Sequence, residues 1–301
     1  MKPIVTLTAL ALIGCAAASS AAPAPSASLA VTETRSFDQF TINDVAASKP
    51  DLIVHYGSGA KQFGELRLPK GRGPFPVAML VHGGCWTAGM GSPRNMAALA
   101  TWLTAHGVAT WNVDYRELGS GGGWTGTFDD WAGALAQLSA LAKPHHLDLG
   151  RVSVVGHSAG ATAAGWLAGP GKDGPAAAVK LPKVRSAVIL DGPSSLAAFV
   201  GADSLICGEP VIAKLMGGSP EAQPARYAMV DPALHPLQVR QFTMVAGVLP
   251  YDKDFIPGLK AKGVAAEQVT LVTESHFDLL APGTRDFVAA APVLLRATGG
   301  R

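Results

Sequence analysis

The sequence predicts an α/β fold, in which a mostly parallel central sheet of about eight strands carries helices on both faces. Two observations support this prediction. Short apolar runs such as residues 76–81 and 184–190 are typical of strands that are buried on both sides. These runs alternate with segments of helical spacing, as in parallel sheets whose strands are joined by crossover helices. The 301 residues suffice for one large domain of this kind.

Eight segments are predicted as strands. The first two are separated by a Gly-Ser-Gly turn and form a hairpin-like start. Each of the others is a short apolar run that ends near a turn or before a helical segment. The predicted strands cover residues 52–56, 63–68, 76–81, 108–113, 152–155, 184–190, 242–246 and 268–272.

Helical spacing of apolar residues predicts helices over residues 94–106, 127–142 and 287–295. Thr127 and Asp130 resemble a capping box, which would account for the acidic residue without catalysis. The segment 194–240 is rich in proline and glycine and is longer than a crossover needs. We expect it to form a small cap over the C-terminal edge of the sheet, where open α/β sheets bind ligands.

The charge balance argues against nucleic acid as a partner. The chain has 24 Lys and Arg against 22 Asp and Glu, a net charge of +2, and no basic stripe. The expected partner is instead a small molecule.

Residues 1–30 are predicted to be an export peptide followed by a linker, so that the folded domain spans residues 31–301. Lys2 precedes an apolar stretch that is too short to span a bilayer. Ser20-Ala21-Ala22 suits ordinary signal peptidase, whereas Leu12-Ile13-Gly14-Cys15 resembles a bacterial lipobox. The protein is therefore expected to be exported, either as a periplasmic or outer-membrane lipoprotein anchored through lipidated Cys15, or as a soluble secreted protein.

A nucleophile elbow is predicted at Gly156-His157-Ser158-Ala159-Gly160. An apolar, β-branched run precedes this G-x-S-x-G string and a helix-compatible run follows it, which is the strand–turn–helix context of such an elbow. Ser158 is therefore the candidate nucleophile. The side chain of His157 is expected to point away from the serine hydroxyl.

A serine hydrolase also needs a base and donors for the oxyanion. His276 is the candidate base, because it follows the last predicted strand. The backbone N–H of Ala159 and those of the glycine turn Gly83-Gly84 are the candidate oxyanion donors.

The acid is left open between several positions. The common pattern is an aspartate three residues after a glycine at the end of the penultimate strand, but Gly247 is followed by Val248-Leu249-Pro250. Asp191 directly follows a buried strand and is one candidate. Asp252 is the second, and Asp254 is a weaker third because it suits the start of a helix.

No metal or other cofactor is expected. His145, His146 and Asp148 form a ligand-like group, but a helix end explains them. Cys85 and Cys207 could pair in an exported protein, yet two cysteines so far apart in sequence are expected to be free and buried.

Three motifs together resemble the α/β-hydrolase superfamily, most closely its small esterases of the hormone-sensitive-lipase-like and kynurenine-formamidase-like kind. The resemblance covers roughly residues 50–295 and implies catalytic roles for Ser158 and His276, with oxyanion donors at Gly83, Gly84 and Ala159. Some lipases of this superfamily carry the acid one strand earlier, which is where Asp191 falls. The motifs are His82-Gly83-Gly84-Cys85-Trp86, Gly156-His157-Ser158-Ala159-Gly160 and His276-Phe277-Asp278-Leu279-Leu280.

Three functions are consistent with these residues. The first is a serine carboxylesterase that cleaves small acyl or aryl esters through an acyl-enzyme. The second is an amidase of the arylformamidase type with the same triad. The third, motivated by the missing acid, is a non-catalytic binding protein that has kept the fold.

Overall fold

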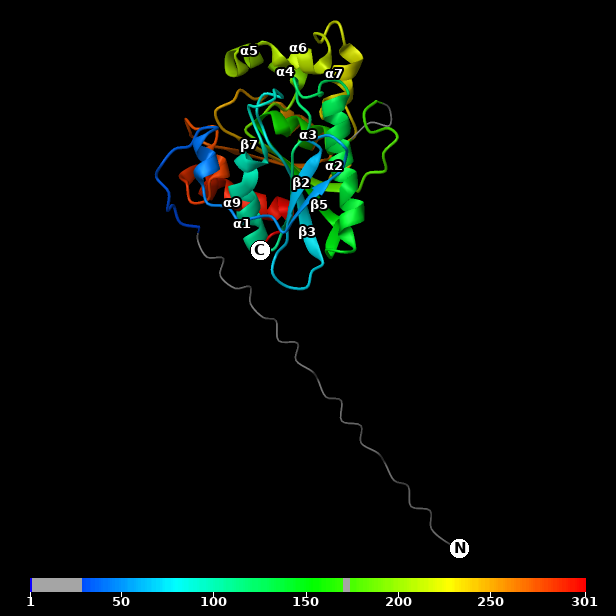
Figure 1. Cartoon of the computed structure of the whole chain (residues 1–301), viewed down its shortest axis with the longest axis vertical. Coiled ribbons are helices and arrows are strands. Elements are labelled where there is room, and N and C mark those ends of the chain that lie inside the picture. Colours follow the sequence, from blue (N-terminus) through cyan, green and yellow to red (C-terminus); the bar gives the residue numbers. More distant parts are fainter. Residues whose placement is uncertain (2–28, 170–173) are drawn as a thin grey trace.

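The computed structural model describes Met1 and residues 29–169 and 174–301, and within these ranges it contains one eight-stranded sheet (Figure 1). The strand order is β1-β2-β4-β3-β5-β6-β7-β8. The pairs β1–β2 and β2–β4 are antiparallel, and all later pairs are parallel. The strands are β1 (Leu52–His55), β2 (Phe63–Arg67), β3 (Phe75–Val81), β4 (Ala109–Val113), β5 (Leu147–His157), β6 (Val184–Leu190), β7 (Gln241–Ala246) and β8 (Ala265–Thr270).

Helices cover both faces of the sheet, as predicted (Figure 1). On one face, α1 (Ala97–Ala105) and α9 (Arg285–Thr298) bury residues such as Leu99 and Phe287. On the other face, α2 (Gly126–Ala142), α3 (Ala161–Leu167) and α8 (Phe255–Ala261) bury Trp131, Trp166 and Leu259. The short 3-10 helices are η1 (Thr41–Asp44), η2 (Pro93–Met96), η3 (Ser158–Gly160) and η4 (Asp278–Leu280).

Four short helices between β6 and β7 lie across one end of the molecule, within the segment expected to form a cap (Figure 1). This end is the carboxyl edge of the parallel strands, because the chain enters the segment directly from β6. The helices are α4 (Leu196–Phe199), α5 (Ala202–Cys207), α6 (Val211–Met216) and α7 (Pro224–Val230).

Two local predictions are wrong. Asp130 does not form a capping box with Thr127; its carboxylate binds the Arg116 guanidinium at 2.7 and 2.9 Å, and the Thr127 hydroxyl donates to the Arg116 carbonyl. The last strand covers Ala265–Thr270 rather than residues 268–272, because its pairing with β7 starts at Ala265 opposite Gln241.

The predicted export peptide, including Cys15, lies outside the described residues. Among the helices that are described, none combines the length and the apolar character needed to cross a bilayer.

Candidate active site

Ser158 lies at the turn between β5 and α3, with a positive φ of 53°. The turn brings Gly156 and Gly160 so close that a Cβ on Gly156 would lie 1.9 Å from the Gly160 carbonyl oxygen. An ordinary side chain cannot fit there, and a Cβ on Gly160 would lie 2.2 Å from the Val81 carbonyl oxygen, so the turn and its packing against β3 require both glycines. In the described part of the chain, the Ser158 hydroxyl takes part in no hydrogen bond within the molecule, which leaves it available to a ligand.

The loop after β3 lies directly against this serine. A Cβ on Gly83 would lie 2.6 Å from the Ser158 Cβ, so this close approach requires glycine. The His82 Nδ1 lies 2.7 Å from the Gly83 carbonyl oxygen. Because the C=O and N–H of a trans peptide point in opposite directions, this bond holds the Gly84 N–H away from the His82 ring.

His276 and Asp191 form a close pair. The His276 Nδ1 lies 2.7 Å from Asp191 Oδ2, and the carboxylate is almost fully buried. Three backbone N–H groups also donate to this carboxylate at 2.9–3.0 Å, from Gly247, Val248 and Leu249. Burial alone would raise the pKa of Asp191, but the bonds from His276 and from the backbone outweigh it and hold the pKa below its usual value.

The structure therefore brings Asp191 to the imidazole and places the alternative candidates elsewhere. Asp252 is exposed and accepts a hydrogen bond from the Asp254 N–H, at the start of α8. Strand pairing explains why Asp191 can reach this position. The ends of β6 and β7 are neighbours, and the Asp191 N–H donates to the Val245 carbonyl at 2.7 Å. The loop after Gly247 thus supplies N–H donors rather than the carboxylate.

His157 has a contact that sequence reasoning did not identify. Its Nε2 lies 2.9 Å from the His276 carbonyl oxygen, and the two rings are 4.4 Å apart between centroids. Burial lowers the pKa of His157 to about 3, so the ring is neutral and its Nε2 donates the bond. His157 thus ties the strand that carries Ser158 to the loop that carries His276. His157 and His276 are 119 positions apart in the chain, and no local sequence pattern indicates their contact.

Ser158 and His276 both line a cavity of about 170 Å³. Gly83 and Gly84 also line it, and within the described residues neither glycine N–H is used in a hydrogen bond. No hydrogen bond joins Ser158 and His276 in this structure; such contacts often tighten only when substrate binds. A larger groove of about 730 Å³ lies beside the N-terminal segment and contains neither residue.

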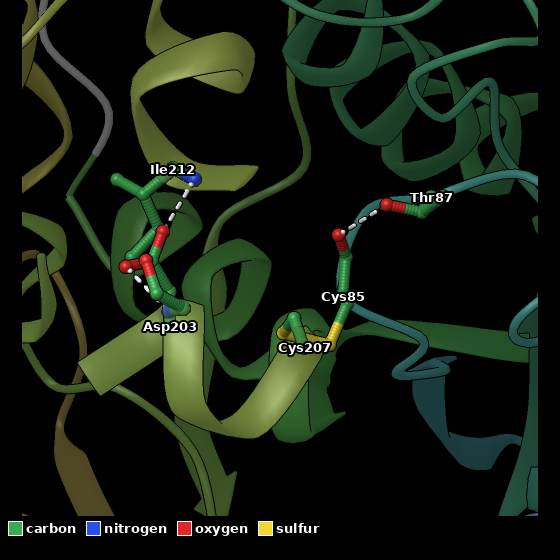
Figure 2. Close-up of a disulfide and its surroundings, with 6 residues drawn as sticks. Cys85, Thr87, Asp203, Cys207 and Ile212 are labelled. Carbon is green, nitrogen blue, oxygen red and sulfur yellow. Dashed lines mark hydrogen bonds between the residues drawn. A yellow bond between two sulfur atoms is a disulfide. The ribbon is translucent and has the colours of Figure 1, made fainter. Parts of the chain in front are cut away.

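Cys85 and Cys207 form a disulfide, which corrects the expectation that they are free (Figure 2). Their Cα atoms are 5.9 Å apart although 122 positions separate them in sequence. The cap folds back over the loop after β3, and this approach of two distant segments is a tertiary event that spacing does not reveal. The bond joins the glycine loop of the site to α5 of the cap.

One buried group has the composition of a metal site. Ligand atoms of His82, Asp114 and Glu117 lie within 4.8 Å of one another. The Lys61 ammonium already lies 3.4 Å from Asp114 and 3.1 Å from Glu117, so it supplies the positive charge that these carboxylates need. We read the group as a structural ion-pair network. Of the other ligand-like group, Asp148 is paired with Arg151 at 2.6 Å.

The comparisons with known proteins agree with this fold. The esterase Est2 of Thermogutta terrifontis with butyrate bound superposes with a TM-score of 0.62 at 17% identity, over 82% of this chain and 91% of that one. Esterase 2 of the same organism, phosphonylated by sarin, gives 0.64 at 16% identity, over 83% and 94%. A bifunctional GH43-CE protein of Bacteroides eggerthii gives 0.64 at 18% identity; the match covers 82% of this chain but only 38% of that longer protein.

At this level of identity the likeness shows the fold alone. No curated protein matches the sequence significantly. The family model BD-FAE matches residues 65–240, which is more than half of the chain. The protein therefore belongs to the BD-FAE family and has an α/β-hydrolase fold.

Proposed function

We propose that the protein is a serine carboxylesterase that cleaves small acyl esters through an acyl-enzyme. One observation carries the proposal: Ser158, at a strained strand-to-helix turn, shares a cavity with His276, whose other ring nitrogen is held by Asp191. A nucleophile, a base and a group that orients the base are the minimum that acyl transfer by serine requires.

In the first step, Ser158 Oγ attacks the ester carbonyl carbon and His276 Nε2 takes the hydroxyl proton. Asp191 holds the ring through Nδ1 and stabilises the imidazolium that forms. The bond to His276 and the backbone donors lower the pKa of Asp191, so this carboxylate stays negative while the ring gains its charge.

The negative charge that develops on the carbonyl oxygen is met by the N–H groups of Ala159 and of the Gly83-Gly84 turn. Such donors act strongly because they are fixed before the reaction starts. His276 then gives its proton to the leaving alcohol. In the second half of the reaction, water takes the place of the alcohol: it attacks the acyl carbon, His276 takes its proton, and the proton is returned to Ser158 Oγ as the acid is released.

The size of the cavity supports small acyl groups. A dry cavity of about 150 Å³ holds one benzene molecule, and the cavity beside Ser158 is about 170 Å³. The structural neighbour from Thermogutta terrifontis has been seen with propionate and with butyrate bound.

The hypothesis of a non-catalytic binding protein depends on one observation, the absence of an acidic residue at the expected position after Gly247. Asp191 lies at hydrogen-bond distance from His276 and offers the missing group. We therefore favour catalysis over binding alone.

The test is the Ser158→Ala variant, assayed with p-nitrophenyl acetate and with a fluorophosphonate probe. We expect a loss of activity of about 10³-fold to 10⁶-fold and no labelling. Ser48→Ala, which removes an exposed hydroxyl outside the cavity, is the matched control and should behave as wild type. Full activity in folded Ser158→Ala protein would refute the proposal.

We also propose that the protein works outside the cytoplasm, because disulfides persist in oxidising compartments. Lipidation at Cys15 remains the proposed route to a membrane anchor. Labelling of cells with a radioactive fatty acid tests it: wild type should incorporate the label and Cys15→Ala should not. Export of an unlabelled wild-type protein would instead support ordinary signal-peptide cleavage.

A further inference from the structure

One wall of the cavity beside Ser158 comes from the cap. Among the described residues that line the cavity, Ile206 of α5 is the contribution of the segment 194–240, and Cys85 of the glycine loop, whose partner Cys207 follows Ile206, also lines it. The remaining lining residues come from the sheet edge and from the N-terminal part of the chain. The position of α5 therefore affects the shape of the site directly.

Helix α5 is fastened at both ends (Figure 2). At its C-terminal end, Cys207 is bonded to Cys85. At its N-terminal end, one carboxylate oxygen of Asp203 accepts the Ile212 N–H at 2.8 Å, which ties α5 to the next cap helix. The other oxygen accepts the N–H of Gly201, just before α5, at 2.9 Å and that of Ser204 at 3.0 Å. Ile206, the residue before Cys207, thus lies between two anchors.

Two adjacent apolar side chains of α5 differ in their surroundings. Ile206 is 40% exposed although it lines the cavity, and the adjacent Leu205 is 89% exposed. An apolar side chain that is held in place and left partly open to a cavity can gain free energy when an apolar ligand covers it. Leu205 is the same kind of residue on the same helix but lies outside the cavity.

We propose that Ile206 is a specificity-determining residue that limits the length of the acyl group carried by Ser158, and that the Cys85–Cys207 bond holds it in that position. The inference rests on the proposed esterase function. It names the substrate class as esters of short acyl chains, from acetyl to about butyryl given a cavity of this size. A longer chain would meet the Ile206 side chain, and the backbone of α5 that carries it is held by both anchors.

The experiment measures kcat/KM for p-nitrophenyl acetate, butyrate, hexanoate and octanoate. Ile206→Ala should raise the ratio of hexanoate to acetate by about 10-fold or more, since each methylene accommodated is worth about that factor. Leu205→Ala is the matched control, and its ratio should stay within about two-fold of wild type. An unchanged ratio in Ile206→Ala, or an equal rise in Leu205→Ala, would overturn the inference.

The anchor is tested separately by Cys207→Ser, which keeps Ile206 but frees the end of α5. The hexanoate to acetate ratio should rise in the same direction, and adding Ile206→Ala to Cys207→Ser should raise it by less than it does in the wild-type background. Full additivity of the two changes would disprove the role of the disulfide. If Cys207→Ser does not fold, wild type reduced with a phosphine and monitored by its melting curve takes its place.

The outcome also separates this inference from the proposed function. A wild-type protein that hydrolyses none of the four esters would refute the esterase function itself. An active wild type whose chain-length preference ignores Ile206 would refute the inference alone.

Discussion

The site has two halves that are held in place by different means. The catalytic half lies on the sheet: Ser158 and Asp191 follow the neighbouring strands β5 and β6, and three backbone N–H groups fix the Asp191 carboxylate. The cap half contributes Ile206 from a six-residue helix that depends on one disulfide and one carboxylate. The proposed reacting groups thus lie on the buried sheet, whereas Ile206 is held at the cavity by contacts of the cap.

This difference suggests that chemistry and selectivity can be changed independently. A change in the sheet half should reduce the rate for every substrate alike. A change in the cap half should alter which substrates are accepted and how stable the molecule is, and leave the intrinsic chemistry in place.

The largest expected effect is on the sheet half. Asp191→Asn should lower kcat by about 10³-fold to 10⁴-fold for every acyl length, because an amide cannot hold His276 in the required tautomer or stabilise the imidazolium. Asp252→Asn is the control; this exposed residue accepts only a local N–H bond, and its change should leave kcat within about two-fold of wild type. Steady-state kinetics of both variants is the measurement. A loss confined to Asp252→Asn would show that the acid is misassigned.

The second prediction concerns the cap half. Replacing both cysteines by serine should lower the free energy of unfolding by about 3 kcal/mol, since the disulfide closes a long loop and its loss gives the unfolded chain more freedom. Urea denaturation of the oxidised wild type and the double variant measures the difference. If stability is unchanged while the chain-length ratio still rises, the bond acts on the native position of α5 alone.

The smallest expected effect concerns His157, which links the strand before Ser158 to the loop that carries His276. Folding holds the pKa of His157 at about 3, against 6.5 when exposed, so the unfolded chain binds the proton more readily. The stability that the folded state gains by keeping His157 neutral is therefore intact above pH 6.5 and is lost as the pH falls from 6.5 toward 3. Between pH 7 and pH 5 the loss amounts to about 2 kcal/mol.

His157→Gln retains an N–H donor for the His276 carbonyl but has no titrating group. It should therefore lose about 2 kcal/mol less than wild type between the same two pH values, as measured by urea denaturation at each pH. Asp191 does not account for a change in stability between these two pH values. Its pKa is lowered on folding, so its contribution is lost only as the pH falls through and below the ordinary carboxyl range. Equal pH dependence in the variant and wild type would contradict the buried, neutral state of His157.

The local sequence predicted the positions of the strands well, because each signal was contained in a few neighbouring residues. The apolar runs predicted all eight strands, and the one displaced strand, β8, is the least apolar of the later ones. The turn around Ser158 could be predicted for the same reason. Its two glycines, the preceding buried run and the following helical run are all within about fifteen positions.

Tertiary structure decided what depends on distant segments meeting. The choice of Asp191 over Asp252 followed from β6 and β7 ending side by side, and the Cys85–Cys207 bond followed from the cap folding over the glycine loop. The contact of His157 with the His276 carbonyl is of the same kind. The sequence determines which chemical groups are present and the local backbone conformation around each. Only the packing of the sheet and the cap determines which of these groups come within hydrogen-bond or covalent reach.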